Sequence, residues 1–200
     1  MEAAVGKKRG RPSEGAREAL VAAAHDLFVE RNYDQVSTEE ILERSGVSRG
    51  ALYHHFPTKV DLFRAVWEAE ERRLLEAIAA QVPAGASPFE FLLAAARAYL
   101  RAAETDESLR RIGLLQSRVV LGWELWQEAS TELGVGVALA SVRAAIEAGE
   151  LPRLDPEALA HAVFAAVIEA ALLIVVAEDR SAAREKSEAV IVDLLEGLRR

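Results

Sequence analysis

The chain has 200 residues, of which 51% are hydrophobic and none is cysteine, and its formal net charge is −8. This length allows one or two small domains that fold unaided, and the lack of cysteine excludes disulfides and cysteine-based metal sites or nucleophiles. Only 6 Pro and 12 Gly are present, and they fall mostly between apolar segments with helical spacing. We therefore expect an all-helical protein with about nine helices, which is soluble and cytoplasmic because the sequence shows no signal region.

Residues 1–12 form a basic segment without apolar periodicity. Arg9 and Arg11 flank Gly10 in a pattern that resembles the core of an AT-hook, which binds the minor groove of A·T-rich DNA. A solvated basic tail fits the same composition. The first 60 residues carry no net charge, so all of the excess negative charge lies in the remainder of the chain, which is compatible with DNA binding near the N-terminus.

An amphipathic helix is expected over residues 13–31, and two short helices follow it. Ser37 and Glu40 have the spacing of a capping box for the first short helix. Gly46 supplies the turn, and Ser48 can cap the second short helix. Two short helices joined by a tight glycine turn predict a helix-turn-helix, whose second helix enters the DNA major groove.

The second short helix, residues 49–56, separates an inward face from an outward one. Leu52 and Phe56 are four residues apart and are expected to pack inward. The outward face then consists of Arg49, Gly50, Tyr53 and His54. An arginine there can bind guanine, at about 1–3 kcal/mol of discrimination, although exposed residues of this kind are also common on surfaces that bind nothing. His54 and His55 have no third ligand at metal spacing, so we expect no metal site.

Residues 13–67 resemble the N-terminal domain of the TetR family of transcriptional regulators, above all in the stretch GVSRGALYHHFPTKVDLF. The resemblance implies a three-helix DNA-binding domain followed by an all-helical C-terminal domain. It also implies a homodimer that binds a palindromic operator in double-stranded DNA and releases it when a small-molecule effector binds. The family's DNA contacts fall on Thr38, Arg49, Gly50, Ala51, Tyr53, His54 and Lys59. Ser37, Ser48, Arg9 and Arg11 complete the DNA-binding residues that we expect.

We expect a flexible arm over residues 1–12, the DNA-binding domain over 13–74 and an effector-binding and dimerisation domain over 82–200. The remaining helices are predicted over 58–81, 87–105, 106 to about 122, 123–149, 155–177 and from Ser181 to the chain end. The charged run EAEERR within the first of these helices is expected to be solvated.

The helix over 155–177 is almost free of charge, but its flanks are acidic, so we expect a buried helix and no membrane span. Together with the last helix, whose apolar stripe includes Leu194, it is expected to form the homodimer interface. Alternatively, both apolar stripes complete the core of the monomer.

The C-terminal domain is expected to hold a mostly apolar ligand pocket without a cofactor. Its predicted lining is Tyr99, Leu114, Gln116, Arg118, Trp123, Trp126, Phe164, Ile168 and Glu169. Glu169 lies in an apolar helix, so it needs a partner such as Arg118, a backbone group or a cationic ligand. A place at the edge of the dimer interface is an equal alternative for Glu169, and the two tryptophans could equally belong to the core.

The sequence favours a transcriptional repressor over an enzyme, because it contains no phosphate-binding loop, no HExxH motif and no paired Glu-x-x-His motifs. A helix-turn-helix adaptor or nucleoid-type protein without an effector is the alternative.

Overall fold

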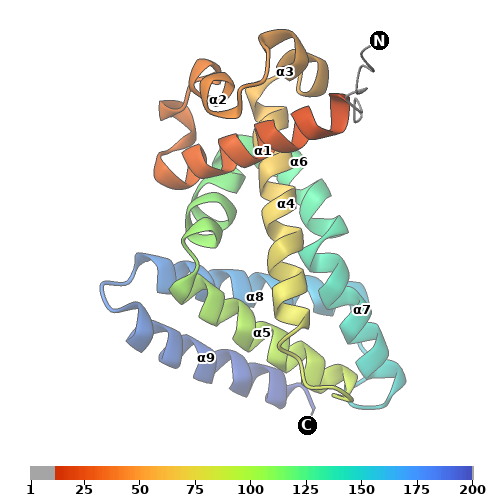
Figure 1. Cartoon of the computed structure of the whole chain (residues 1–200). Coiled ribbons are helices and arrows are strands. Elements are labelled where there is room, and N and C mark those ends of the chain that lie inside the picture. Colours follow the sequence, from red (N-terminus) through yellow and green to blue (C-terminus); the bar gives the residue numbers. More distant parts are fainter. Residues whose placement is uncertain (1–11, 200) are drawn as a thin grey trace, which may run out of the picture. The chain divides into compact units, whose positions relative to one another are not determined.

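The computed structural model describes residues 12–199, with the side chains of residues 15–199, and this part of the chain is helical with no strand (Figure 1). The helices are α1 (Pro12–Glu30), α2 (Thr38–Ser45), α3 (Arg49–His55), α4 (Lys59–Ala79), α5 (Pro88–Thr105), α6 (Ser117–Glu132), α7 (Gly134–Glu147), α8 (Pro156–Val176) and α9 (Arg180–Gly197). A short 3₁₀ turn, η1 (Tyr33–Gln35), precedes α2, and a π-helix, η2 (Leu109–Gln116), precedes α6. The predicted DNA contacts Arg9 and Arg11 lie outside the described residues.

The chain divides into two compact units, and the division falls inside α4. The first unit ends at Val66 and the second begins at Trp67. This division lies within the range of 13–74 that we expected for the DNA-binding domain.

The first unit folds around apolar residues of α1, α2, α3 and the start of α4. Leu20 and Phe28 of α1, Ile41 of α2, Leu52 of α3 and Phe63 of α4 are fully or almost fully buried. The predicted caps are confirmed: Ser37 Oγ accepts from Glu40 N at 3.2 Å, and Ser48 Oγ accepts from Ala51 N at 3.3 Å.

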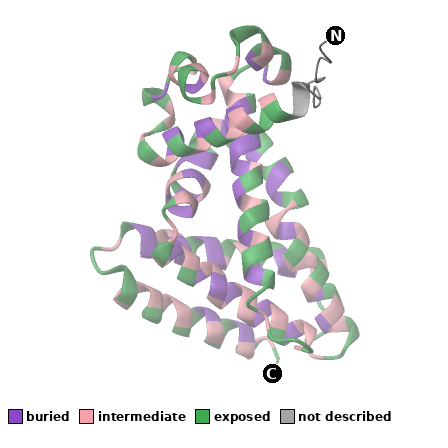
Figure 2. Ribbon diagram, in the orientation of Figure 1, coloured by how far each residue is buried: buried purple, intermediate pink, exposed green. Residues whose placement is uncertain are grey.

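The second unit is built around α5 and α8, which pack against each other. Both of these helices also contact α7 and α9. Figure 2 shows the buried residues that gather along α5 and α8, among them Leu100 and Ile174. Ser87 and Asp155 cap α5 and α8, because each side chain accepts from the backbone N–H three residues later.

The predicted boundary between two helical segments at Gly122 is confirmed, because Gly122 is non-helical at φ 71° within α6. The predicted single helix over 123–149 is wrong, since the chain breaks again at Leu133 before α7. Directly after this break the backbone approaches α8 closely, because a Cβ built on Gly134 would lie 2.7 Å from Phe164 Cε2. The start of the last helix also differs, since Asp179 caps α9 and accepts from Ala182 N at 3.0 Å, two residues before the predicted start.

Among the described residues, α8 is the one single helix that is long and apolar enough to cross a membrane. The bent pair of helical segments over 109–147 also passes this test if it is taken as one span. Because α8 contacts α5, α7 and α9, it has the position of a core helix, as predicted.

Replacing Gly46 by alanine should destabilise the first unit, whereas the same change at Gly50 should not. Gly46 ends α2 at φ 67°, a left-handed conformation that costs an L-residue about 1–2 kcal/mol. Gly50 lies in α3 without positive φ, and open space surrounds the added Cβ, so alanine there should gain up to about 1 kcal/mol. Urea unfolding of both variants measures this; equal shifts in the same direction would contradict the assignment of the turn.

Candidate DNA-binding surface and ligand cavity

The exposed face of α3 carries the side chains that the sequence predicted. Arg49, Gly50, Tyr53 and His54 are exposed, whereas Leu52 is buried. The i, i+3, i+4 spacing of the helix explains this division, because Leu52 and Phe56 anchor one side of α3 in the core. Ser37 and Ser48 are also exposed, and Thr38 and Ala51 are partly exposed.

The guanidinium of Arg49 forms an ion pair with Glu39 of α2. Both side chains are about three-fifths exposed, at 60% and 62%, and exposed pairs of this kind contribute only about 0–1 kcal/mol to stability. The pair therefore holds Arg49 at the surface in a defined orientation without binding it strongly.

Lys59 is engaged within its own unit. Its ammonium donates to the backbone oxygen of Tyr33 at 2.5 Å and lies 3.8 Å from the centroid of the Tyr33 ring. Burial is the main cause that lowers the pKa of Lys59. This side chain joins the start of α4 to η1, a structural role that the sequence did not suggest.

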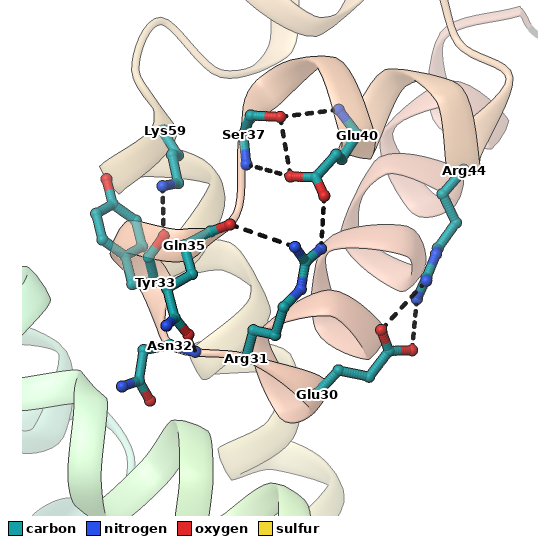
Figure 3. A network of polar contacts seen from close by, with 9 residues as sticks. All are labelled: Glu30, Arg31, Asn32, Tyr33, Gln35, Ser37, Glu40, Arg44 and Lys59. Carbon is teal, nitrogen blue, oxygen red and sulfur yellow. Dashed lines mark hydrogen bonds and ion pairs between the residues drawn. The ribbon is translucent and has the colours of Figure 1, made fainter.

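A polar network fixes α2 against the end of α1 (Figure 3). Arg31 donates to Glu40 Oε1 at 2.8 Å, and Arg44 makes a two-pronged contact with Glu30 at 2.8 and 3.2 Å. Glu40 also accepts from Ser37 N at 2.8 Å. The backbone N–H of Ser37, followed by Arg31 and the Ser37 hydroxyl, lowers the pKa of Glu40 to about 2.

His54 and His55 have ring centroids 5.3 Å apart. Within residues 15–199, no group of three or more His, Asp or Glu side chains is arranged to hold a metal ion. The exposed side chains of α3 present the Arg49 guanidinium and the hydrogen-bonding groups of Tyr53 and His54.

The second unit contains an apolar cavity of about 220 Å³ among α4, α5, α7 and α8. Tyr99, Phe164 and Ile168, which the sequence predicted, line it. Glu71 supplies the one carboxyl group of the lining, and the rest of the wall is almost entirely apolar. Such a cavity suits the apolar part of a small organic molecule.

A smaller cavity of about 20 Å³ adjoins the same wall. The predicted residues Leu114, Arg118 and Trp126 line it, and the Arg118 guanidinium lies 4.3 Å from the centroid of the Trp126 ring. Trp67 and Ser130 also belong to this lining, and Ser130 Oγ is buried without a hydrogen-bond partner.

Three predicted pocket residues lie elsewhere, and we correct their assignment. Gln116 is buried but lines neither cavity, and Trp123 is 67% exposed. Glu169 is exposed on α8, beside Leu173, Lys186 and Val190. Trp123 follows the non-helical Gly122, so its direction could not be deduced from ideal helical spacing.

The prediction that the EAEERR segment is solvated is wrong at Glu71, which lines both cavities. The signal was present: Glu71 follows Trp67 by four residues and precedes Leu75 and Ile78 by four and seven, so it lies on the apolar stripe of α4. Burial, followed by the neighbouring charge of Glu70, raises the pKa of Glu71 to about 7.

The chain is similar to known transcriptional regulators along most of its length. Residues 20–66 match the family described as bacterial regulatory proteins, tetR family, and residues 89–198 match the tetracyclin repressor-like C-terminal domain. The crystal structure of a TetR-family transcriptional regulator from Pectobacterium atrosepticum is 31% identical, with a TM-score of 0.80 over 96% of this chain and 98% of that chain.

Two curated relatives match shorter parts. The HTH-type transcriptional activator FasR of Mycolicibacterium smegmatis is 32% identical over 109 residues, which are 54% of this chain and 50% of FasR. The HTH-type transcriptional repressor BepR of Brucella suis is 44% identical over 50 residues, which are 25% of this chain and 24% of BepR. The matched part thus spans half or less of each of these two relatives.

Replacing Glu40 by glutamine should weaken the first unit at neutral pH and make its stability less sensitive to acid. Because the folded-state pKa of about 2 lies below the ordinary value of 4.5, ionised Glu40 stabilises the fold above pH 4.5, and this contribution is lost as pH falls through 2. Melting temperatures between pH 7 and pH 2 should therefore show the gap between parent and Glu40→Gln closing with acid. Glu43→Gln, at an exposed site of the same helix, is the control, and a gap of constant size would contradict the role of Glu40.

Proposed function

Because the chain belongs to the TetR family of transcriptional regulators, whose members bind DNA and are not enzymes, we propose that it is a cytoplasmic repressor. We propose further that it binds a palindromic operator as a homodimer and leaves it when a small molecule enters the second unit. The observation that carries this proposal is an apolar cavity in the same chain as an exposed helix-turn-helix. An adaptor without an effector would have no need of such a cavity.

The proposed contact with DNA uses the exposed face of α3. Arg49 reads a base in the major groove, and Tyr53 and His54 donate to phosphates on either side of it. The exposed side chains Ser37, Thr38 and Ser48 lie at the starts of α2 and α3, where N-terminal backbone N–H groups favour phosphate. Gly50 and Ala51 leave room for the backbone of α3 to approach the bases.

The proposed dimer interface is the exposed apolar side of α8 and α9. Leu173 and Val176 of α8 and Val190 and Leu194 of α9 are all more than half exposed. A surface of this kind is expected to be covered by a partner, and a second copy gives the two-fold symmetry that a palindromic operator requires. Glu169 lies on this side of α8, so its alternative place at the edge of the interface is the one that we propose.

Selection of bound DNA from a random pool tests the repressor proposal directly. We expect the recovered sequences to share an inverted repeat, and a reporter controlled by that repeat to be expressed less when the protein is present. Recovery of unrelated sequences would contradict operator binding. Higher reporter expression in the presence of the protein would identify an activator.

Replacing Arg49 by alanine should relax the preference for one base pair in each half-site. The loss of a bidentate contact to guanine removes about 1–3 kcal/mol of discrimination at that position and leaves the other positions unchanged. Repeating the selection with Arg49→Ala measures this. Arg153→Ala, which removes an exposed charge from a loop of the second unit, is the control for net charge, and an identical preference in both variants would exclude Arg49 as a base reader.

Replacing Leu194 by glutamate should convert the dimer into monomers, because it buries a charge in the proposed interface. Sedimentation velocity measures the change in mass, and binding to the selected operator should weaken with it. The matched control is Leu154→Glu in the loop before α8, since Leu154 is 51% exposed and Leu194 is 56% exposed. A Leu194→Glu protein that remains dimeric would place the interface elsewhere.

A further inference from the structure

The two cavities of the second unit share one stretch of wall. Glu71, Tyr99, Gly134, Phe164 and Ile168 line both of them. The larger cavity is lined almost entirely by apolar residues, whereas the smaller one has polar atoms in its lining, among them Trp67 Nε1, which interacts with Glu71, and Ser130 Oγ, which is buried without a hydrogen-bond partner. The two cavities therefore differ in polarity, and Glu71 borders both of them.

No positively charged side chain of the described residues forms an ion pair with Glu71. Glu70, its neighbour on α4, is bound to Arg73 at 2.5 Å. Arg118 borders the smaller cavity, where its guanidinium stacks on Trp126, and its charge acts on Tyr99. The indole of Trp67 is close enough to lower the pKa of Glu71, but burial outweighs it and the pKa is raised. An ionised Glu71 is thus short of a positive partner.

Two aromatic rings stand on the same wall as this carboxyl group. Tyr99 of α5 and Phe164 of α8 border both cavities together with Glu71. A positive charge is attracted both to a carboxylate and to the faces of aromatic rings, most strongly where water is excluded. An ionised Glu71 repels a ligand anion and gives no charge attraction to an uncharged ligand, whereas it attracts a cation.

We propose that this cavity binds an amphipathic organic cation, whose ammonium group pairs with Glu71 between Tyr99 and Phe164. The apolar body of the cation occupies the larger cavity, between α5, α7 and α8. The binding assignment stands on the cavity alone, and only its consequence for DNA rests on the proposed repressor function.

The probe is benzyltrimethylammonium, and the uncharged comparison is neopentylbenzene, in which carbon replaces the nitrogen. Calorimetry at pH 8 should show the cation binding at least tenfold more tightly than its isostere. Glu71→Gln should abolish that difference, and Glu76→Gln, at an exposed glutamate of the same helix outside both cavities, should preserve it. Equal binding of the two probes to the parent protein, or a preference that survives Glu71→Gln, would overturn the proposal.

The folding of the variant is checked in the same experiment. Because Glu71 has a folded-state pKa of about 7, above its ordinary value of 4.5, its ionisation destabilises the fold as pH rises from 4.5 through 7. Glu71→Gln should therefore melt at a higher temperature than the parent at pH 8, so that its loss of cation binding cannot be ascribed to unfolding. A lower melting temperature would show that Glu71 is a structural residue and would overturn the assignment.

The pH dependence gives a second, independent readout. The quaternary probe does not titrate, and burial raises the pKa of Tyr99 well above its ordinary value, so Tyr99 stays neutral. Glu70 is held by Arg73, and the Arg118 guanidinium lies over the Trp126 ring. The affinity should therefore rise as pH increases through about 7 and level off above it, following Glu71. A constant affinity between pH 6 and pH 8 would count against Glu71 as the partner of the cation.

Measuring whether each probe releases the protein from the selected operator distinguishes failure of the ligand assignment from failure of the repressor function. If benzyltrimethylammonium binds through Glu71 but leaves operator binding unchanged, the cavity assignment stands and effector release fails. If an uncharged compound binds the cavity and releases the operator while the cation does neither, the repressor function stands and the ligand class is wrong.

Discussion

Helix α4 must bury one apolar stripe along its whole length, and the two units of the chain depend on that constraint. Phe63 and Val66 contribute to the core of the first unit, and Leu74 and Ile78 are buried in the second. Capping at Thr58 starts this helix in register, because Asp61 accepts from Thr58 N at 2.8 Å and donates its own backbone N–H to Thr58 Oγ1 at 3.1 Å. A change in the phase of α4 would therefore disturb both cores at once.

The first unit combines rigid packing with weakly held surface charge. The rings of Phe28, Tyr33 and Phe63 meet edge to face or tilted, with centroids 5.2–5.7 Å apart, and contacts of this kind contribute about 0.5–1.5 kcal/mol beyond their burial. The exposed Arg49–Glu39 pair is worth about 0–1 kcal/mol, less than the roughly 1–3 kcal/mol of a good contact to guanine. In the proposed contact with DNA, Arg49 therefore exchanges Glu39 for a base at little cost. The negative charge of Glu39 also weakens the binding of Arg49 to other negatively charged molecules that cannot replace the pair.

Much of the fold could be predicted from the sequence, because its signals are local. The Ser37–Glu40 box, the Ser87 and Asp155 caps and the Gly46 turn act over three or four residues, so reading the sequence is enough to place them. The break at Leu133 could not be predicted in this way, and neither could the close approach of Gly134 to Phe164, which joins residues thirty positions apart. The exposed face of α3 was predicted for the same local reason, whereas the true cavity wall depends on which helices meet.

Glu71 and Glu169 show that helical spacing alone does not predict which glutamate lines a cavity. Both interrupt apolar stripes, yet Glu71 borders the cavity and Glu169 is exposed on α8, because the difference lies in what packs against each helix. At Glu71 the facing element is the π-helix η2, where a Cβ on Gly113 would lie 3.4 Å from Glu71 Oε1 and 2.8 Å from Leu109 Cδ1. Because η2 has a wider turn and Gly113 has no side chain, the backbone of η2 lies close to the Glu71 carboxyl and leaves the space beside it open. π-Helices are frequently found at functional sites. A glutamine there would avoid the cost of a buried charge, so the glutamate makes sense as a binding group and not as a stabilising one.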